Sequence, residues 1–196
     1  TLTGVGSKLP GVLLPLAHDN LPAALVLLMI STIILGMGLP SAVCYLLMAT
    51  LVGPLLTDMG PTPLAGHLFI FYFGMMSMVT PPVALAAYTA AAIADSPVLK
   101  TGVAAFRFAL IGFALPFAFV LRPELLMLSP DGGPASLGAI LLNLLTATIG
   151  IGALAAAVAG YLRLPLSPAY RLLLAPAAAV FLFVEPTAVN LGILVA

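Results

Sequence analysis

Residues 31–45 read STIILGMGLPSAVCY, and residues 77–83 read SMVTPPV. Both stretches interrupt long apolar segments with glycine or proline. The glycines of the first stretch allow a tight backbone turn, because glycine has no Cβ. The paired prolines of the second lack backbone N–H groups, and an α-helix breaks where two such residues follow each other. The two stretches therefore predict a helical hairpin with its tip at Gly36–Ser41 and a helix broken at Ser77–Pro82.

The composition around these breaks is that of a membrane protein. The 196 residues are 63% hydrophobic and 6% charged, with six basic and six acidic side chains. A soluble domain carries about 25% charged residues and uses them to cover its surface. Here no charge lies between Asp19 and Asp58, or between Asp58 and Asp95. Lipid removes the need for a polar surface, so we expect an all-α integral membrane protein.

Several functional classes are disfavoured by the same composition. The formal net charge is zero, so no electrostatic footprint for nucleic acid is present. Cys44 is the only cysteine and has no second thiol with which to form a disulfide or a metal site. No Ser/His/Asp, paired-carboxylate, Cys/His or phosphate-loop arrangement stands out. We therefore expect neither an enzyme nor a bound organic cofactor.

The lengths of the apolar segments around the breaks indicate half-spans. The arms Leu21–Leu35 and Ser41–Leu56 are each about 15 or 16 residues long. A full crossing of the hydrocarbon core needs ~20 residues as a helix. The segment 21–57 is therefore predicted as a re-entrant hairpin whose tip stops partway through the membrane. The next segment is predicted as two half-helices, Leu64–Met78 and Val83–Ala94.

Three continuous helices are predicted beyond the broken helix, namely Gly102–Leu121, Ser136–Leu162 and Tyr170–Val184. The predicted organisation has three parts. Residues 1–20 form a connector and a helix end. Residues 21–125 form the core, with the hairpin at 21–57, the broken helix at 63–94 and a helix at 102–121. Residues 126–196 form additional transmembrane helices, ending in the short apolar tail 187–196.

Unwound backbone at membrane depth is tolerated where protein, water or an ion satisfies its polar groups, which makes the two breaks the candidate site. Carbonyl and hydroxyl oxygens are suitable ligands for Na⁺, and the predicted set is Gly36, Ser41, Ser77 and Thr80. Helix N-terminal ends favour anions, so the predicted substrate-binding set is Gly38, Pro40, Ser41, Pro81 and Pro82. Neither break carries a carboxylate, which argues against a proton relay.

The same residues carry a family resemblance. The chain resembles the large permease subunit of tripartite ATP-independent periplasmic (TRAP) transporters at LGMGLPSAVCY (35–45), AGHLFIFYFG (65–74) and SMVTPPVALAAY (77–88). The likeness is closest to the fused permeases that work with TAXI-type binding proteins, which KTGVAAFR (100–107) also matches. Residues 146–160 and 164–171 resemble the extra C-terminal helices of those fused forms.

The resemblance implies half of an elevator-type, inverted-repeat transporter in the bacterial inner membrane, where the chain would be a multi-pass protein. It implies sodium-coupled uptake of an organic anion of the dicarboxylate, keto acid or amino acid type. Its partners would be membrane lipid, a periplasmic substrate-binding protein and the rest of the fused permease, including the N-terminal repeat and the small-subunit helices. The chain would supply half of the ion and substrate site.

Two other interpretations compete with transport. In a structural or assembly domain without its own ligand site, the breaks would be kinks packed against protein. A membrane-embedded enzyme would use a residue such as His67 or Glu124 and would need further polar groups in the same cavity. A lone histidine on such a helix is more often a packed or interfacial residue. Arg107 is expected to extend to the membrane interface, with a role in binding a substrate carboxylate as the alternative.

Overall fold

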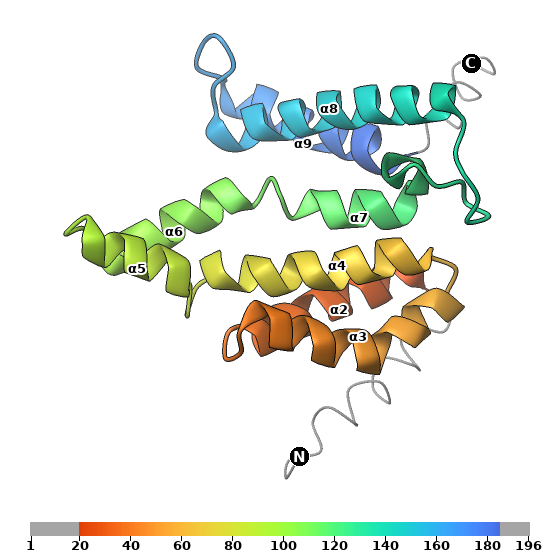
Figure 1. The fold of residues 1–196 in the computed structure, drawn as a ribbon. Helices are drawn as coiled ribbons and strands as arrows, with labels where there is room; N and C mark the ends of the chain where they lie inside the picture. The colour runs from red at the N-terminus through yellow and green to blue at the C-terminus, as the bar shows by residue number, and fades with distance from the viewer. Residues whose placement is uncertain (1–19, 185–196) are drawn as a thin grey trace. The chain divides into compact units, whose positions relative to one another are not determined.

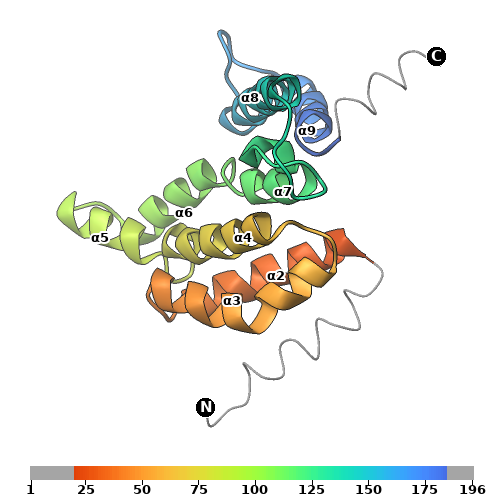
Figure 2. The same ribbon diagram turned by 45° about the vertical axis from the view of Figure 1, so that its right-hand side comes forward.

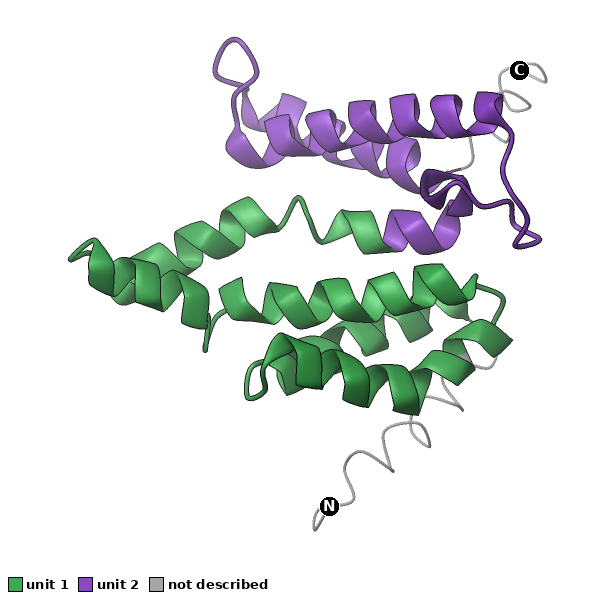
Figure 3. Cartoon of the chain, in the orientation of Figure 1, with its two compact units in different colours: residues 1–116 green, residues 117–196 purple. Residues whose placement is uncertain are grey.

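The computed structural model of the chain describes residues 20–184, and most of them are helical (Figure 1). No β-strand occurs within this range, where β-type pairing is limited to two isolated bridges. The predictions for residues 1–19 and for the tail 187–196 lie outside the described residues. The chain divides into two compact units, residues 1–116 and 117–196, which are coloured separately in Figure 3.

The first unit begins with a helical hairpin. Helix α2 covers Leu21–Gly36, a turn follows, and α3 covers Ser41–Asp58. The side chain of Asn20 accepts a hydrogen bond from the backbone N–H of Ala23 at 3.2 Å and so caps the start of α2. Helix α4, Pro63–Met76, lies alongside both arms in the two views of Figures 1 and 2. These three helices occupy the positions of the predicted hairpin and first half-helix.

Large apolar side chains fill the space between α2, α3 and α4. Phe69 and Phe73 of α4 are fully buried, and their ring centroids lie 4.8 Å apart in an edge-to-face arrangement. Phe113 continues the cluster, with its ring centroid 5.6 Å from that of Phe73. The other large side chains that are buried with them are Leu25, Leu28, Met48, Val52 and Ile70. This packing holds the hairpin against the broken helix.

The broken helix ends its first half earlier than the apolar pattern predicts. After α4 the backbone tightens into a 3₁₀ turn, η1 (Ser77–Val79), and α5 then covers Leu85–Ile93. Thr80 is extended, with φ −96° and ψ 118°, as expected for a residue that precedes proline. The Pro81–Pro82 peptide bond is cis. The α5 helix begins two residues later than predicted because Ala84 adopts a left-handed conformation with φ 35°.

The structure corrects the single helix predicted over Gly102–Leu121. Two helices are present, α6 (Val98–Ala109) and α7 (Ala114–Leu121). Between them the backbone N–H groups of Gly112, Phe113 and Leu115 bond to carbonyls three residues earlier, at 2.8, 3.2 and 3.2 Å. Pro116 favours this interruption, because it has no N–H to bond the carbonyl of Gly112 and its ring would collide with that carbonyl in a regular helix.

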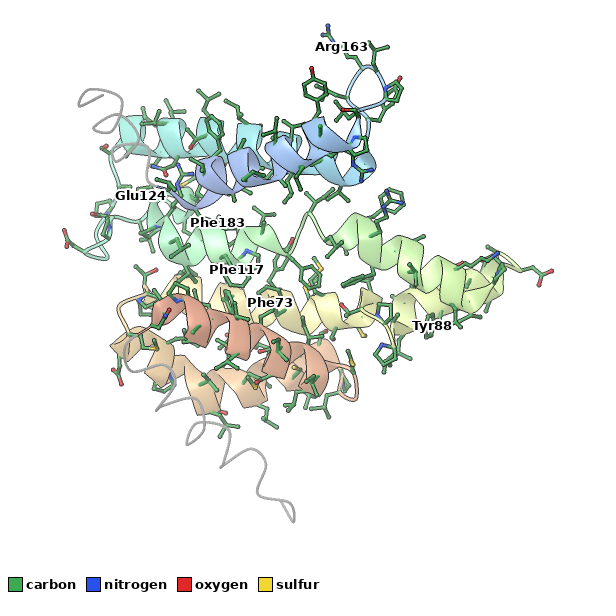
Figure 4. The ribbon with its side chains drawn as sticks, turned by 180° about the vertical axis from the view of Figure 1, so that it is seen from behind. Phe73, Tyr88, Phe117, Glu124, Arg163 and Phe183 are labelled. Carbon is green, nitrogen blue, oxygen red and sulfur yellow. The ribbon has the colours of Figure 1, made fainter. Side chains whose placement is uncertain are left out.

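The second unit is built on a pair of helices, α8 (Leu137–Ala159) and α9 (Pro168–Phe183). Small residues let their backbones approach closely. A Cβ placed on Gly150 of α8 would lie 2.8 Å from Cγ of Leu182 and 3.2 Å from the carbonyl oxygen of Ala178. The predicted helix Ser136–Leu162 ends at Ala159 because Gly160 is left-handed, with φ 73°. Figure 4 shows Phe117 and Phe183, whose ring centroids lie 6.5 Å apart.

A buried arginine joins the helices of the second unit. Arg122 follows α7 directly, and its side chain is 0% exposed. Its Nε donates to Oδ1 of Asn143 at 2.6 Å, and one terminal nitrogen donates to the carbonyl oxygen of Phe181 at 2.6 Å. The other terminal nitrogen donates to Oγ1 of Thr146 at 2.5 Å. No motif in the sequence singled out this arginine.

Helix length and composition agree with a membrane location. Within the described residues, three helical segments are long and apolar enough to span a bilayer, namely Ser41–Asp58, Val98–Leu121 and Leu137–Ala159. The second of these includes the interruption before α7. The apolar segments Leu21–Gly36, Pro63–Val79 and Pro168–Phe183 are shorter. The chain is therefore an all-α membrane protein.

Candidate functional site

The two sequence breaks touch each other. Gly36 is the last residue of α2, and it is buried against Ser77, the first residue after α4. A Cβ built on Gly36 would lie 2.5 Å from Oγ of Ser77, 2.8 Å from its Cβ and 3.4 Å from the carbonyl oxygen of Gly74. No other residue could stand at position 36 without moving Ser77. The tip of the hairpin and the end of the first half-helix therefore form one location in the fold.

The hydroxyl groups of the second break point back along their own helix. Ser77 is 1% exposed, and its hydroxyl donates to the carbonyl oxygen of Gly74 at 2.7 Å. Thr80 is 9% exposed, and its hydroxyl donates to the carbonyl oxygen of Met76 at 2.7 Å. A hydroxyl oxygen that donates its proton in this way keeps its lone pairs for an acceptor role. Both oxygens thus have the chemistry required to approach a cation.

The first residue of α3 also lies near this contact. Ser41 is half-buried, and its carbonyl oxygen lies 3.7 Å from a Cβ built on Gly74. Gly38 and Pro40 are exposed in the turn, and a Cβ on Gly38 would meet no atom within 4 Å. The structure therefore brings Gly36, Ser41 and Ser77 around Gly74, while the turn residues remain open to the surroundings.

The directions of the helices determine the sign of the partial charge at this contact. Gly36 ends α2, and Ser77 follows the end of α4, so two helix C-termini meet at the Gly36–Ser77 contact. A helix C-terminus carries a partial negative charge from carbonyl groups that have no partner within the helix. The α3 and α5 helices begin just beyond the turn and the break, and their N-termini carry the opposite partial charge. The contact itself therefore favours a cation.

Comparison with known proteins identifies the family. Residues 1–130 match the profile of the tripartite ATP-independent periplasmic transporter, DctM component. The chain belongs to this family. Searches of the curated proteins and of the solved structures found no match. The DctM component is part of a transporter and not an enzyme, and both breaks lie inside the matched region.

The two prolines of this DctM-family chain lie in the second break, between Thr80 and the start of α5. Pro81 is half-buried, and Pro82 is exposed. They separate Thr80 from Ala84, which is 0% exposed and forms the left-handed start of α5. Their place between the two half-helices matches the break predicted from the sequence.

Two residues near the site were missed by the sequence analysis. Gly74 accepts the Ser77 hydroxyl and packs beneath Ser41, and its spacing of three residues before Ser77 was the available signal. Thr32 is 0% exposed, and its Oγ1 has no hydrogen-bond partner within residues 20–184. It lies one helical turn before Gly36, so both residues share one face of α2. Spacing of four residues from a tip glycine could have identified it.

His67 of this DctM-family chain has a partner on α3. The hydroxyl of Tyr45 lies 3.2 Å from Nδ1 of His67, and the two rings meet edge to face with centroids 6.0 Å apart. The pair therefore links α3 to α4, as a packed interfacial histidine would. Glu124, the other residue considered for an enzyme, belongs to the second unit.

Replacing Gly36 with alanine should destabilise the contact between the breaks. The new Cβ would overlap Ser77, and overpacking a tight site costs about 1–3 kcal/mol. The thermal unfolding midpoint of the purified full-length permease measures this loss. Gly53→Ala is the matched control in α3, because its Cβ would meet only Cε1 of His67 at an ordinary 3.8 Å. Equal stability of the two variants would contradict the close contact at Gly36.

Proposed function

We propose that the full-length protein couples the entry of Na⁺ to the uptake of an organic anion of the dicarboxylate, keto acid or amino acid type. The contact between Gly36 and Ser77 is the observation that carries this proposal. It joins two helix C-termini at a point where buried hydroxyl and carbonyl oxygens gather. Oxygen ligands and converging negative helix ends are the features that bind Na⁺ in broken-helix transporters.

The residues assigned to the ion are those that surround this contact. Gly36 and Ser41 come from the two sides of the hairpin tip, and Ser77 and Thr80 come from the helix break. These groups fit a hard monovalent cation because they offer neutral oxygen atoms. The substrate anion is assigned to the N-terminal ends of α3 and α5, near Gly38, Pro40, Ser41, Pro81 and Pro82.

Membership of this transporter family supports a periplasmic binding protein as the partner of the chain. Within that family we assign the chain to the fused permeases that work with TAXI-type binding proteins. It would then act in the bacterial inner membrane as a multi-pass protein, with the α2–α3 hairpin re-entrant. An N-terminal repeat with a second hairpin and break would supply the other half of the site, completing an elevator-type transporter with inverted repeats.

Removing single hydroxyls tests the ion assignment. Ser41→Ala and Thr80→Ala should each raise the Na⁺ concentration needed for half-maximal uptake by roughly 10-fold, which corresponds to one lost contact with a charged group. The assay is uptake of labelled dicarboxylates, keto acids and glutamate into proteoliposomes that contain the full-length permease and its binding protein, at a series of Na⁺ concentrations.

Thr50→Ala is the matched control for this experiment. The Thr50 hydroxyl donates to the carbonyl oxygen of Leu46, four residues earlier, just as Thr80 donates to Met76, but Thr50 is exposed on α3 away from the breaks. Its loss should leave the sodium dependence unchanged. An unchanged sodium dependence in both Ser41→Ala and Thr80→Ala would reject these ion ligands. Uptake that needs no Na⁺ in the unmodified protein would reject sodium coupling and favour the purely structural interpretation of the breaks.

A further inference from the structure

The carbonyl group of Pro82 is bound by a side chain from beyond the break. It lies outside the hydrogen-bond ladder of α5, because that helix begins at Leu85. The hydroxyl of Tyr88 donates to this carbonyl oxygen at 2.8 Å. The backbone N–H of Tyr88 bonds the carbonyl oxygen of Ala84 at 2.9 Å, so Tyr88 is already part of the helix. One tyrosine thus ties the second half-helix back to the peptide that interrupts it.

The residue enclosed by this tie has a strained backbone. Ala84 has φ 35° and ψ 48°, and its side chain is 0% exposed. A residue with a Cβ rarely adopts this left-handed conformation, and it does so where the surroundings hold it. The hydrogen bond between Tyr88 and Pro82 joins residues that flank Ala84 in the sequence. It is therefore in a position to hold the backbone conformation of the break that follows Thr80.

Helix α6 fixes the ring that makes this bond. Gly102 is buried, and a Cβ built on it would lie 2.6 Å from Cε1 of Tyr88 and 3.4 Å from Cδ1. The ring of Tyr88 occupies the space that any side chain at position 102 would fill. Figure 4 shows Tyr88 where α5 and α6 lie beside each other next to the end of α4. The ring of Tyr88 therefore links the geometry of the break to α6.

We propose that Tyr88 is a positioning residue for the cation site, acting through the carbonyl of Pro82 and held in place by Gly102. The proposal rests on the proposed function, because it takes Na⁺ as the ligand. Tyr88 itself is not assigned to the ion. Its hydroxyl keeps the break in the conformation that presents the oxygens of Ser77 and Thr80. Without this bond, the break is expected to sample other conformations, and the apparent affinity for Na⁺ falls with the population of the competent one.

The test uses the thermal stability of the purified full-length permease and needs no knowledge of the substrate. A ligand that binds the folded state raises the unfolding midpoint in a concentration-dependent way. The midpoint is measured over a series of NaCl concentrations, with KCl added to keep ionic strength constant. Tyr88→Phe removes one oxygen and keeps the ring. It should shift the Na⁺ concentration for half-maximal stabilisation upward by roughly 3- to 10-fold, as expected for one hydrogen bond.

Two controls separate positioning from general stability. Thr89→Val removes a neighbouring hydroxyl that donates to the carbonyl oxygen of Leu85 on the exposed side of α5, and it should leave the sodium response unchanged. Gly102→Ala keeps the Tyr88 hydroxyl but displaces the ring, so it should shift the response in the same direction as Tyr88→Phe. Its control is Gly152→Ala, because a Cβ on Gly152 would meet no atom within 4 Å.

Each outcome has a separate meaning. Absence of sodium-specific stabilisation in the unmodified permease would reject the proposed sodium function and, with it, the basis of this inference. A normal response in the unmodified protein and an identical response in Tyr88→Phe would overturn the role of Tyr88 alone. A lower midpoint in KCl with an unchanged sodium concentration dependence would also overturn it, because that result is purely structural. If Tyr88→Phe does not accumulate, an unchanged sodium response in Gly102→Ala decides against the proposal.

Discussion

Replacing Pro81 and Pro82 together with alanine is expected to reduce uptake to background while leaving membrane insertion intact. Alanine restores both backbone N–H groups and removes the rings that oppose helical backbone. Each proline disfavours a helix interior by about 3 kcal/mol relative to alanine. The segment from η1 to α5 would then favour one continuous helix over the present break, in which Thr80 is extended. A continuous helix would use its carbonyls internally and leave none for a ligand.

The measurement is uptake of labelled dicarboxylates, keto acids and glutamate by proteoliposomes, with the amount of inserted permease determined on the same sample. Pro54→Ala is the matched control, because Pro54 lies inside the helix α3 rather than at a break. Its replacement should preserve uptake. Normal uptake by a well-inserted double variant at positions 81 and 82 would show that the break is not needed for transport.

Replacing Arg122 with alanine is expected to lower the free energy of unfolding by several kcal/mol, since each buried acceptor that is left unpaired costs about 1–3 kcal/mol. Asn143 Oδ1 and the carbonyl oxygen of Phe181 would lose the donor that now reaches each of them at 2.6 Å. Arg122→Lys should recover part of the loss, because a single ammonium group cannot reproduce the planar fork of the guanidinium group.

Hydrogen exchange of backbone amides localises this effect. Peptides from α8 and α9 in the full-length permease should exchange faster in Arg122→Ala, because Arg122 bonds residues of both helices. Arg163→Ala is the control. Arg163 lies exposed in the loop between α8 and α9, as Figure 4 shows, and its replacement should change stability by less than about 0.5 kcal/mol. Equal exchange in the two alanine variants would reject a stabilising role for Arg122.

The helix boundaries show which features of the fold depend only on residues that are close in the sequence. Asn20 and Ser136 start their helices by accepting hydrogen bonds from backbone N–H groups three residues later, and Gly160 ends α8 in a left-handed conformation. These effects depend on neighbours within one turn, so the sequence contains them. The interruption before α7 shows the limit. Pro54 and Pro176 lie inside continuous helices, whereas Pro116 follows a break, so a proline alone does not predict the outcome.

Tertiary packing distinguishes the interruption before Pro116 from the continuous helices around Pro54 and Pro176. Gly112 lies against the side chains of Tyr72 and Met76, where its Cβ would meet Oη of the tyrosine at 3.0 Å. Phe113 contributes its ring to the cluster around Phe73. These contacts come from a helix that is distant along the chain, and they accompany the displaced backbone ahead of Pro116. No pattern within residues 102–121 encodes them.

The sequence by itself determined that the chain is a helical membrane protein and where its apolar segments break, because hydrophobicity and the missing N–H of proline act locally. Only the tertiary structure decided that Gly36 meets Ser77, that Tyr88 fills the space above Gly102, and that Arg122 bonds a residue 59 positions away. The physical reason is the solvent. Lipid is as apolar as the protein core, so a helix that is apolar all round carries no periodic signal for the face that packs against protein.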